Sequence, residues 1–205
     1  MNTQTLFTLL IKLALLETPN LHDGTEKHAK RLESMHRMAE QYVEIGKAGK
    51  FISPEADPLI LAAIGFEESR HRTYVADGDC AYPSIGPKVC HAAGPMQISK
   101  SLPALFKADP FWASVTTEKL RDPETSVRAA YNLLVYWKDQ CKGSPVVTLG
   151  SWSAGKCVGK IDMGKRRCAL AKAFGEAAGV EVAGCDTPTA DERTKRRVAA
   201  IKKAD

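Results

Sequence analysis

The sequence predicts a mainly α-helical fold, because apolar residues recur at helical spacing in several segments and strand-like alternation is scarce. Apolar residues make up 44% of the 205 residues and charged residues 26%, which is ordinary for a globular protein. The length is sufficient for one substantial core, or for one domain with appended helices. The composition gives no indication of a disordered, collagenous or membrane-spanning chain.

The first predicted helix covers residues 6–16, where only Thr8 and Lys12 interrupt an apolar run. This run is too short to span a bilayer. It lacks the preceding basic residues and the small-residue cleavage site that are typical of a signal peptide. We therefore expect an amphipathic helix that packs on the domain, and an atypical export signal is the alternative.

Four further helices are expected at about 26–45, 59–71, 123–141 and 164–178. The clearest of them begins at Pro123 and presents one apolar face, formed by Val127, Ala130, Tyr131, Leu134 and Val135. Between the second and third of these four helices, residues 73–93 contain two glycines and two prolines and are expected to form a long loop. The chain ends in a tail rich in lysine and arginine from Thr187 onward.

Charge and cysteine content suggest the surroundings in which the protein works. The net charge of +5 suits an anionic partner such as nucleic acid, a membrane surface or a cell wall, and an ordinary solvated surface explains it equally well. The chain contains no Cys-x-x-Cys pair, so the sequence predicts disulfides in an oxidising compartment and no metal site. Six cysteines allow 15 connectivities: Cys80, Cys90, Cys141, Cys157, Cys168 and Cys185.

Two adjacent carboxylates near the end of the third helix are the first candidates for chemistry. Glu67 and Glu68 both follow apolar residues at helical spacing, so periodicity does not choose between them. A carboxylate on an apolar helix face tends to have a raised pKa, which suits a general acid near neutral pH. The alternative is a pair of exposed acids that form ion pairs with nearby basic residues.

Three other short segments contain residue types that suit sugar recognition. Gly94 permits a tight turn, and Gln97 offers both a donor and an acceptor to a sugar amide or hydroxyl. Asp122 and Pro123 precede the fourth helix, and a Trp-Ser-Ala-Gly run begins at Trp152. Each segment alone is also explained by packing or by helix capping.

The order and spacing of these segments resemble the soluble lytic transglycosylases and their goose-type lysozyme relatives. That family has a helix ending in Glu-Ser, then Gly-Leu-Met-Gln, then Leu-x-Asp-Pro, and finally Ala-Tyr-Asn-x-Gly. The matching segments here are Glu68-Ser69, residues 94–98, Leu120 with Asp122-Pro123, and residues 151–155. The resemblance covers residues 57–175.

The resemblance implies a lysozyme-like single catalytic domain at 57–186, preceded by an N-terminal helical segment at 1–56 and followed by a basic tail at 187–205. It also implies that Glu68 is the catalytic acid/base, because the family's catalytic glutamate immediately precedes Ser. The remaining matched positions would line a groove for alternating N-acetylmuramic acid and N-acetylglucosamine: Ser69, Met96, Gln97, Trp152 and Gly155.

Two positions depart from the family pattern. Trp152 stands where the family usually has Tyr, and Ser153 stands where it has Asn. A tryptophan still supplies a flat face for sugar stacking and one N–H donor, but it has no hydroxyl to accept a hydrogen bond. The departure therefore bears on how Glu68 is oriented.

The implied reaction needs one carboxylate, since the muramoyl 6-hydroxyl attacks its own anomeric carbon and gives a 1,6-anhydro end. A hydrolytic muramidase, the alternative, would need a second carboxylate to activate water. Asp77 and Asp79 lie near where goose-type lysozymes carry such an acid, although Asp77-Gly78 is also a common turn pair. Bacteriolytic enzymes of either kind would need no cofactor.

Two rival classes complete the expectations. One is a weakly active protein that keeps the groove only to bind the wall, and the other is a basic nucleic-acid binder, which no recognised motif supports. We expect a monomer whose partner is the glycan strand of peptidoglycan, with no nucleic-acid partner and no transmembrane segment. It would work outside the cytoplasm, as a protein of the envelope or periplasm or as a secreted or phage-delivered endolysin.

The simplest disulfide arrangement pairs neighbours in the sequence. Cys141 with Cys157 would close the segment between the fourth helix and the Trp-Ser-Ala-Gly run, which would stabilise the fold by roughly 3 kcal/mol. Cys80 with Cys90 would brace the loop that holds Asp77 and Asp79. Cys168 with Cys185 would then tie the fifth helix to the start of the tail.

Overall fold

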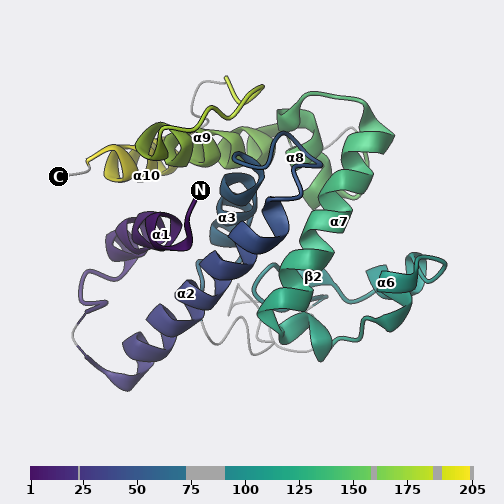
Figure 1. Ribbon diagram of the computed structural model, residues 1–205, viewed down its shortest axis with the longest axis horizontal. Helices are drawn as coiled ribbons and strands as arrows, with labels where there is room; N and C mark the ends of the chain where they lie inside the picture. The colour runs from purple at the N-terminus through teal and green to yellow at the C-terminus, as the bar shows by residue number, and fades with distance from the viewer. Residues whose placement is uncertain (23, 73–90, 158–160, 187–190, 204–205) are drawn as a thin grey trace.

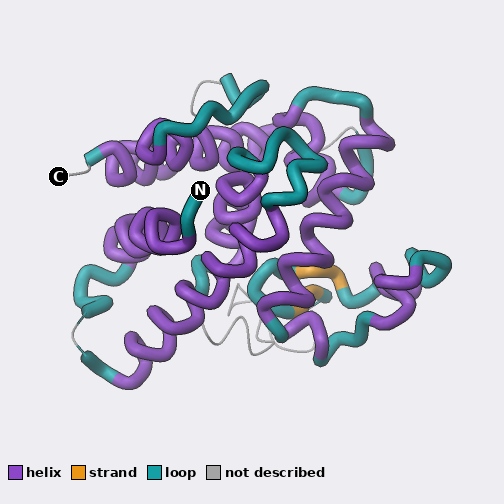
Figure 2. Tube along the Cα trace, viewed as in Figure 1, coloured by secondary structure: helices purple, strands orange, loops and turns teal. Residues whose placement is uncertain are grey.

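The computed structural model describes residues 1–22, 24–72, 91–157, 161–186 and 191–203. These residues are mainly helical, which confirms the predicted fold class (Figure 2). The elements in chain order are α1 (Thr3–Glu17), α2 (Glu26–Gly46), α3 (Asp57–Ser69), β1 (Ala92–Ala93), β2 (Ile98–Ser99), α5 (Leu102–Leu105), α6 (Pro110–Ser114), η2 (Lys119–Arg121), α7 (Pro123–Cys141), α8 (Pro145–Ala154), α9 (Ile161–Ala178) and α10 (Glu192–Lys202).

Helix α3 lies at the centre of the molecule, between α2 and α7 and beneath α9 (Figure 1). Asp57 anchors its first turn, because the carboxylate accepts hydrogen bonds from the backbone of Phe51 (2.9 Å) and Ile52 (2.7 Å) and from the Tyr131 hydroxyl (2.6 Å). Burial and the hydrogen bond to Asp57 raise the pKa of Tyr131 above its ordinary value. The opposite end of α3 carries the two candidate glutamates.

Helix α1 forms over the apolar run that the sequence marks, and its buried leucines belong to the same hydrophobic core as α3. The side chain of Asn2 caps it by accepting from the backbone of Thr5 at 2.8 Å. It packs against α2 and α10. None of the helices within the described ranges is both long and apolar enough to cross a bilayer.

Most of the described part of the predicted basic tail forms helix α10, which packs on the rest of the molecule. Asp191 caps α10 by accepting from the backbone of Thr194 at 2.7 Å, and Thr194, Arg197 and Ile201 are buried against the rest of the molecule. Arg197 forms ion pairs with carboxylates on α1 and α3. Local composition does not predict such long-range pairs.

The Gly-Pro-Met-Gln segment is the tip of a two-stranded hairpin in which Ala92 pairs with Ser99 and Ala93 with Ile98. Gly94 has a φ of 72°, and a Cβ there would overlap the carbonyl oxygen of Leu120. This glycine therefore permits a close approach of backbone to the η2 segment.

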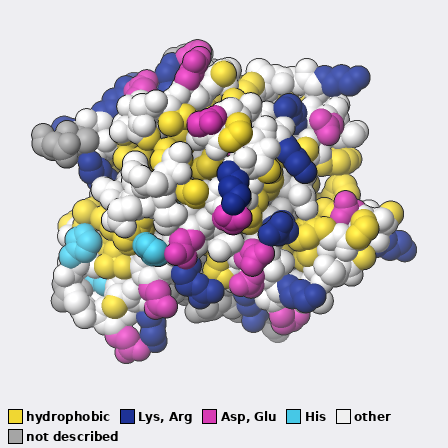
Figure 3. All heavy atoms as spheres, viewed as in Figure 1, with side chains coloured by type: hydrophobic (Ala, Val, Ile, Leu, Met, Phe, Trp, Pro, Cys, Tyr) yellow, Lys and Arg dark blue, Asp and Glu magenta, His cyan; other side chains and the backbone are white. Residues whose placement is uncertain are grey.

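Two of the three predicted disulfides are present. Cys141–Cys157 and Cys168–Cys185 have Cα–Cα distances of 5.1 and 4.9 Å. The predicted Cys80–Cys90 pair lies outside the described residues. On the face in Figure 3, basic and acidic side chains lie interspersed, as on an ordinary solvated surface.

Candidate active site

The two glutamates at the end of α3 have different arginine partners. Glu67 accepts a hydrogen bond from Arg197 of α10, and Glu68 accepts one from Arg167 of α9. Consecutive helical residues point about 100° apart, so each carboxylate meets a different neighbouring helix. The side chain of Glu67 is 8% exposed and that of Glu68 is 20% exposed, so Glu68 is the more accessible acid.

Arg167 joins three helices around Glu68. Its side chain is fully buried, and it donates to the carbonyl oxygen of Leu149 in α8 at 2.6 Å as well as to Glu68. Its guanidinium lies 4.9 Å from the centre of the Trp152 ring. A guanidinium over an aromatic face is an attractive cation–π arrangement. Arg167 therefore brings the Glu-Ser and Trp-Ser-Ala-Gly segments together.

Arg167 is not among the residues that the sequence motifs predict for the site. Its position on the buried face of the helix could have been predicted, because the apolar residues Leu170, Ala171 and Phe174 follow it at helical spacing. All three are buried in the structure. An arginine on an apolar helix face needs a hydrogen-bond acceptor inside the protein. This requirement is the feature of the sequence that could have identified Arg167 as a partner of a buried acid.

Trp152 sits inside the protein rather than on an open wall. It is 8% exposed, and Arg167 covers one face of its ring. Its indole N–H has no hydrogen-bond partner within the described structure. Gly155 ends α8 in the left-handed region, with a φ of 65°. Sugar stacking by Trp152 stays a prediction, whereas its place beside the ion pair of Glu68 is established.

Met96 packs against helix α3, whereas the side chain of Gln97 stays within the hairpin. Met96 is buried and accepts a hydrogen bond from the Tyr42 hydroxyl at 3.5 Å, next to Gly65 of α3. Its backbone N–H is bound to the Ser126 hydroxyl at 3.2 Å. Gln97 is partly buried and donates its side-chain amide to the hairpin carbonyl of Gly94 at 3.0 Å. Thus Met96 packs one turn before Glu68, and Gln97 braces the hairpin.

Helix α3 ends directly after Glu68, with Ser69 as its last residue. The Ser69 hydroxyl donates to the carbonyl of Gly65 at 3.1 Å and accepts from the backbone of His71 at 3.1 Å. Its one donor is therefore used within the protein. His71 is buried, and burial together with the charge of Arg31 lowers the pKa of His71 to about 3. This histidine is neutral near pH 7.

Three predicted features fall outside the part of the chain that is described, namely Asp77, Asp79 and the Cys80–Cys90 bridge. Within the described part, no three His, Cys, Asp or Glu side chains gather as metal ligands would.

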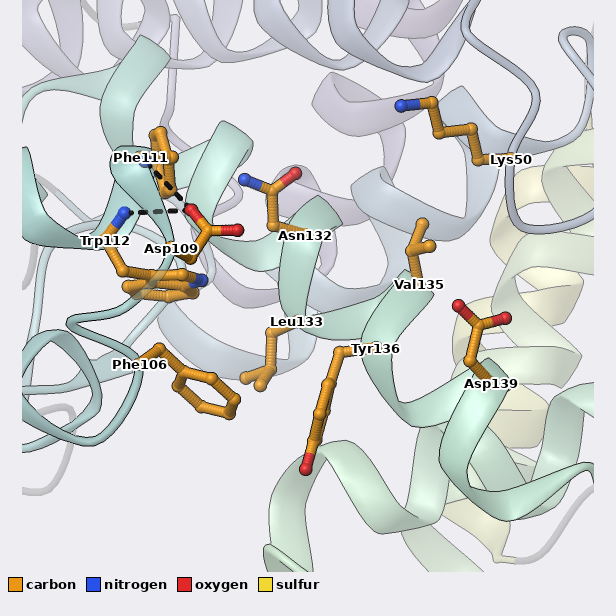
Figure 4. Close-up of a pocket in the computed structure, with 10 residues that line it drawn as sticks. All are labelled: Lys50, Phe106, Asp109, Phe111, Trp112, Asn132, Leu133, Val135, Tyr136 and Asp139. Atoms are coloured by element: carbon orange, nitrogen blue, oxygen red, sulfur yellow. Dashed lines mark hydrogen bonds between the residues drawn. The ribbon is translucent and has the colours of Figure 1, made fainter.

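A separate hollow of about 310 Å³, the aromatic pocket, lies between α7 and the α5–α6 segment (Figure 4). The rings of Phe106 and Tyr136 meet edge to face with centroids 4.9 Å apart, and Asn132 and Asp139 also line it. Aromatic faces beside amide and carboxylate groups are surfaces to which a sugar can bind. The remaining lining residues are Lys50, Asp109, Phe111, Trp112, Leu133 and Val135.

Comparisons with family models, with curated proteins and with solved structures found no match to this chain.

Proposed function

We propose that this protein cleaves the β-1,4 bond between N-acetylmuramic acid and N-acetylglucosamine in peptidoglycan, as a lytic transglycosylase that leaves 1,6-anhydromuramoyl ends. One observation carries the proposal. Arg167 connects Glu68 with Trp152, and these residues belong to two of the segments that resemble the family. Two disulfides are consistent with work in an oxidising, extracytoplasmic compartment.

Glu68 would serve first as acid and then as base. It gives its proton to the glycosidic oxygen as the bond between that oxygen and the anomeric carbon breaks. The 6-hydroxyl of the same sugar then attacks the anomeric carbon, and the Glu68 carboxylate takes up the hydroxyl proton. Arg167 would hold the carboxylate in place through the hydrogen bond that it donates to Glu68.

Digestion of purified peptidoglycan, followed by mass spectrometry of the soluble fragments, tests the proposal. We expect anhydromuramoyl ends. Reducing muramic acid ends would instead establish a hydrolytic muramidase, with Asp77 or Asp79 as candidates to activate water. An absence of soluble fragments from the folded protein would refute both forms of the enzyme.

The two neighbouring glutamates provide a matched pair of variants. Glu68→Gln is expected to lower the rate of wall lysis by about 10²–10⁴-fold, the usual contribution of general acid–base catalysis. Glu67→Gln is expected to keep the activity per folded molecule. It should lower the free energy of unfolding by about 1–3 kcal/mol, because Arg197 loses a charged partner. A fatal Glu67→Gln change with an active Glu68→Gln variant would assign the chemistry to Glu67.

A second candidate function is glycan binding with little or no cleavage, and the aromatic pocket favours it. Sedimentation with insoluble peptidoglycan tests this function separately from turnover. Binding by both wild-type protein and Glu68→Gln, without fragments from either, would select the binding protein over the enzyme.

A further inference from the structure

A second hollow, the arginine cavity, lies where the ends of α1 and α3 meet α10. Its volume is about 430 Å³. Its lining residues come from three parts of the chain: Leu16, Glu17, Arg70, Arg72, Arg193, Arg196 and Arg197. Elements far apart in sequence therefore converge to place five arginines around one space.

Among the described residues, two acids form ion pairs with the arginines of this cavity. Glu17 forms ion pairs with Arg70 (3.1 Å), Arg72 (3.7 Å), Arg193 (3.1 Å) and Arg197 (2.8 Å). Arg197 is also paired with Glu67 of α3. Within the described part of the chain, the five arginines that line the cavity therefore outnumber the two glutamates with which they pair.

Other ion pairs of the molecule show that this crowding is unusual. Lys30 with Glu26 and Arg128 with Glu124 are one-to-one pairs on a single exposed helix face. In the cavity, by contrast, four arginines share Glu17, whose side chain is 16% exposed. Like charges gathered in a partly buried space repel one another more strongly than they would in bulk water.

The cavity has the chemistry of an oxyanion site. Guanidinium groups present rigid forks of N–H donors that match the oxygens of phosphate and carboxylate groups. A space that is lined by several arginines suits a dianion better than a monoanion. The volume falls within the range of about 300–1,000 Å³ that is usual for small-ligand sites, so an organic group beside the anion has room.

We propose that the arginine cavity binds a phosphate dianion, either inorganic phosphate or the phosphate of a small phosphomonoester. The site is separate from the proposed cleavage of glycan strands. Glu67 and Glu68 are adjacent, but Glu67 faces this cavity's Arg197 and Glu68 faces Arg167.

Calorimetric titration near neutral pH tests the site, with inorganic phosphate and glycerol 3-phosphate as probes and sodium acetate at equal ionic strength as reference. We expect saturable binding of at least one phosphate probe and none of acetate. Tighter binding of glycerol 3-phosphate identifies an organic phosphomonoester as the ligand class, and tighter binding of inorganic phosphate identifies the free ion. Identical heats for phosphate and acetate would overturn the proposal.

Two exposed helical arginines provide variant and control. Arg196 lines the cavity, and Arg37 lies on α2; neither has an ion pair within the described ranges. Arg196→Gln should weaken phosphate binding by about tenfold, the effect of losing one charge-assisted hydrogen bond. Arg37→Gln should leave the affinity unchanged. Equal affinity in wild type and Arg196→Gln would place any bound phosphate elsewhere.

The melting temperature of a Glu17→Gln variant distinguishes a phosphate site from a cluster of arginines that only stabilises the fold. Glu17→Gln removes the shared negative charge, so the melting temperature without phosphate should fall. Added phosphate should then raise the melting temperature of this variant by more than it raises that of wild type. A melting temperature that falls and does not respond to phosphate would show that the arginines serve only to dock α10.

Discussion

At the scale of single residues, Arg167 is the side chain on which the geometry around Glu68 depends. Arg167→Met would remove the hydrogen bonds that Arg167 donates to Glu68 and to the Leu149 carbonyl, so we expect a loss of about 2–4 kcal/mol in the free energy of unfolding. Arg167→Lys keeps the charge but not the fork, and should lose about 1 kcal/mol. Urea unfolding measures both changes.

The neighbouring Arg166 is the control, because it is 36% exposed and pairs with Asp191 at 2.7 Å on the surface. Arg166→Met should cost no more than about 1 kcal/mol. A double-mutant cycle between Arg167→Met and Glu68→Gln should show coupling. Strictly additive effects would mean that the two side chains do not interact in solution.

His71 gives the fold a predictable response to acid. In the folded protein its pKa is lowered to about 3, whereas in an unfolded chain it is about 6.5. Below pH 6.5 the unfolded chain therefore binds a proton that the folded protein does not, so stability falls as the pH falls towards 3. Between pH 6.5 and 5, before most carboxylates titrate, this loss should be about 2 kcal/mol.

Chemical unfolding of His71→Asn at several pH values checks this expectation. Asparagine tolerates the left-handed backbone at this position, where φ is 51°, and it does not titrate. Its stability should change less between pH 6.5 and 5 than that of wild type. A control variant, His36→Gln, alters a partly exposed histidine and should keep the wild-type slope. The same slope in wild type and His71→Asn would exclude His71 as the source.

At the scale of elements, two disulfides join segments in the second half of the chain, and they differ in their exposure to solvent. Cys168 and Cys185 are fully buried, whereas Cys141 and Cys157 are partly exposed. Each bridge closes a loop of about the same length, with sequence separations of 16 and 17, and should contribute about 3 kcal/mol in the chain-entropy model.

Because a reductant must reach the sulfur atoms, mild reduction of the folded protein should open Cys141–Cys157 first. Thiol labelling followed by peptide mapping gives the order of opening. A bridge between Cys168 and Cys185 that opens first would mean that α9 separates locally from its surroundings.

At the scale of the whole molecule, α10 completes the core from the far end of the chain. Ile201 is fully buried, so Ile201→Ala should destabilise the protein by about 2–4 kcal/mol. Lys195 on the same helix is exposed, and Lys195→Ala should change stability by no more than about 0.5 kcal/mol. Thermal unfolding compares the two variants. Equal melting temperatures would restore the interpretation of residues 187–205 as a tail.

Local chemistry explains which elements were predictable. The α7 helix begins at Pro123 after Asp122, whose carboxylate accepts from the backbone of Thr125 at 2.9 Å, as an N-cap in the sequence suggests. The α8 helix begins at Pro145 after Ser144, which caps it in the same way. It was not predicted, because it is short and lies between two longer predicted helices. The short α5 and α6 helices were also missed, because helices of one turn leave little periodicity to detect.

The mainly helical class, most of the long helices and two disulfides between near neighbours could be predicted from the sequence, since caps, periodicity and short loops are local properties. The pairing of Glu67 with Arg197 and of Glu68 with Arg167, across separations of 130 and 99 residues, became visible only in the folded structure. Ion pairs between helices depend on how those helices pack, and packing follows from the burial of whole apolar faces. No local pattern around either glutamate contains that information.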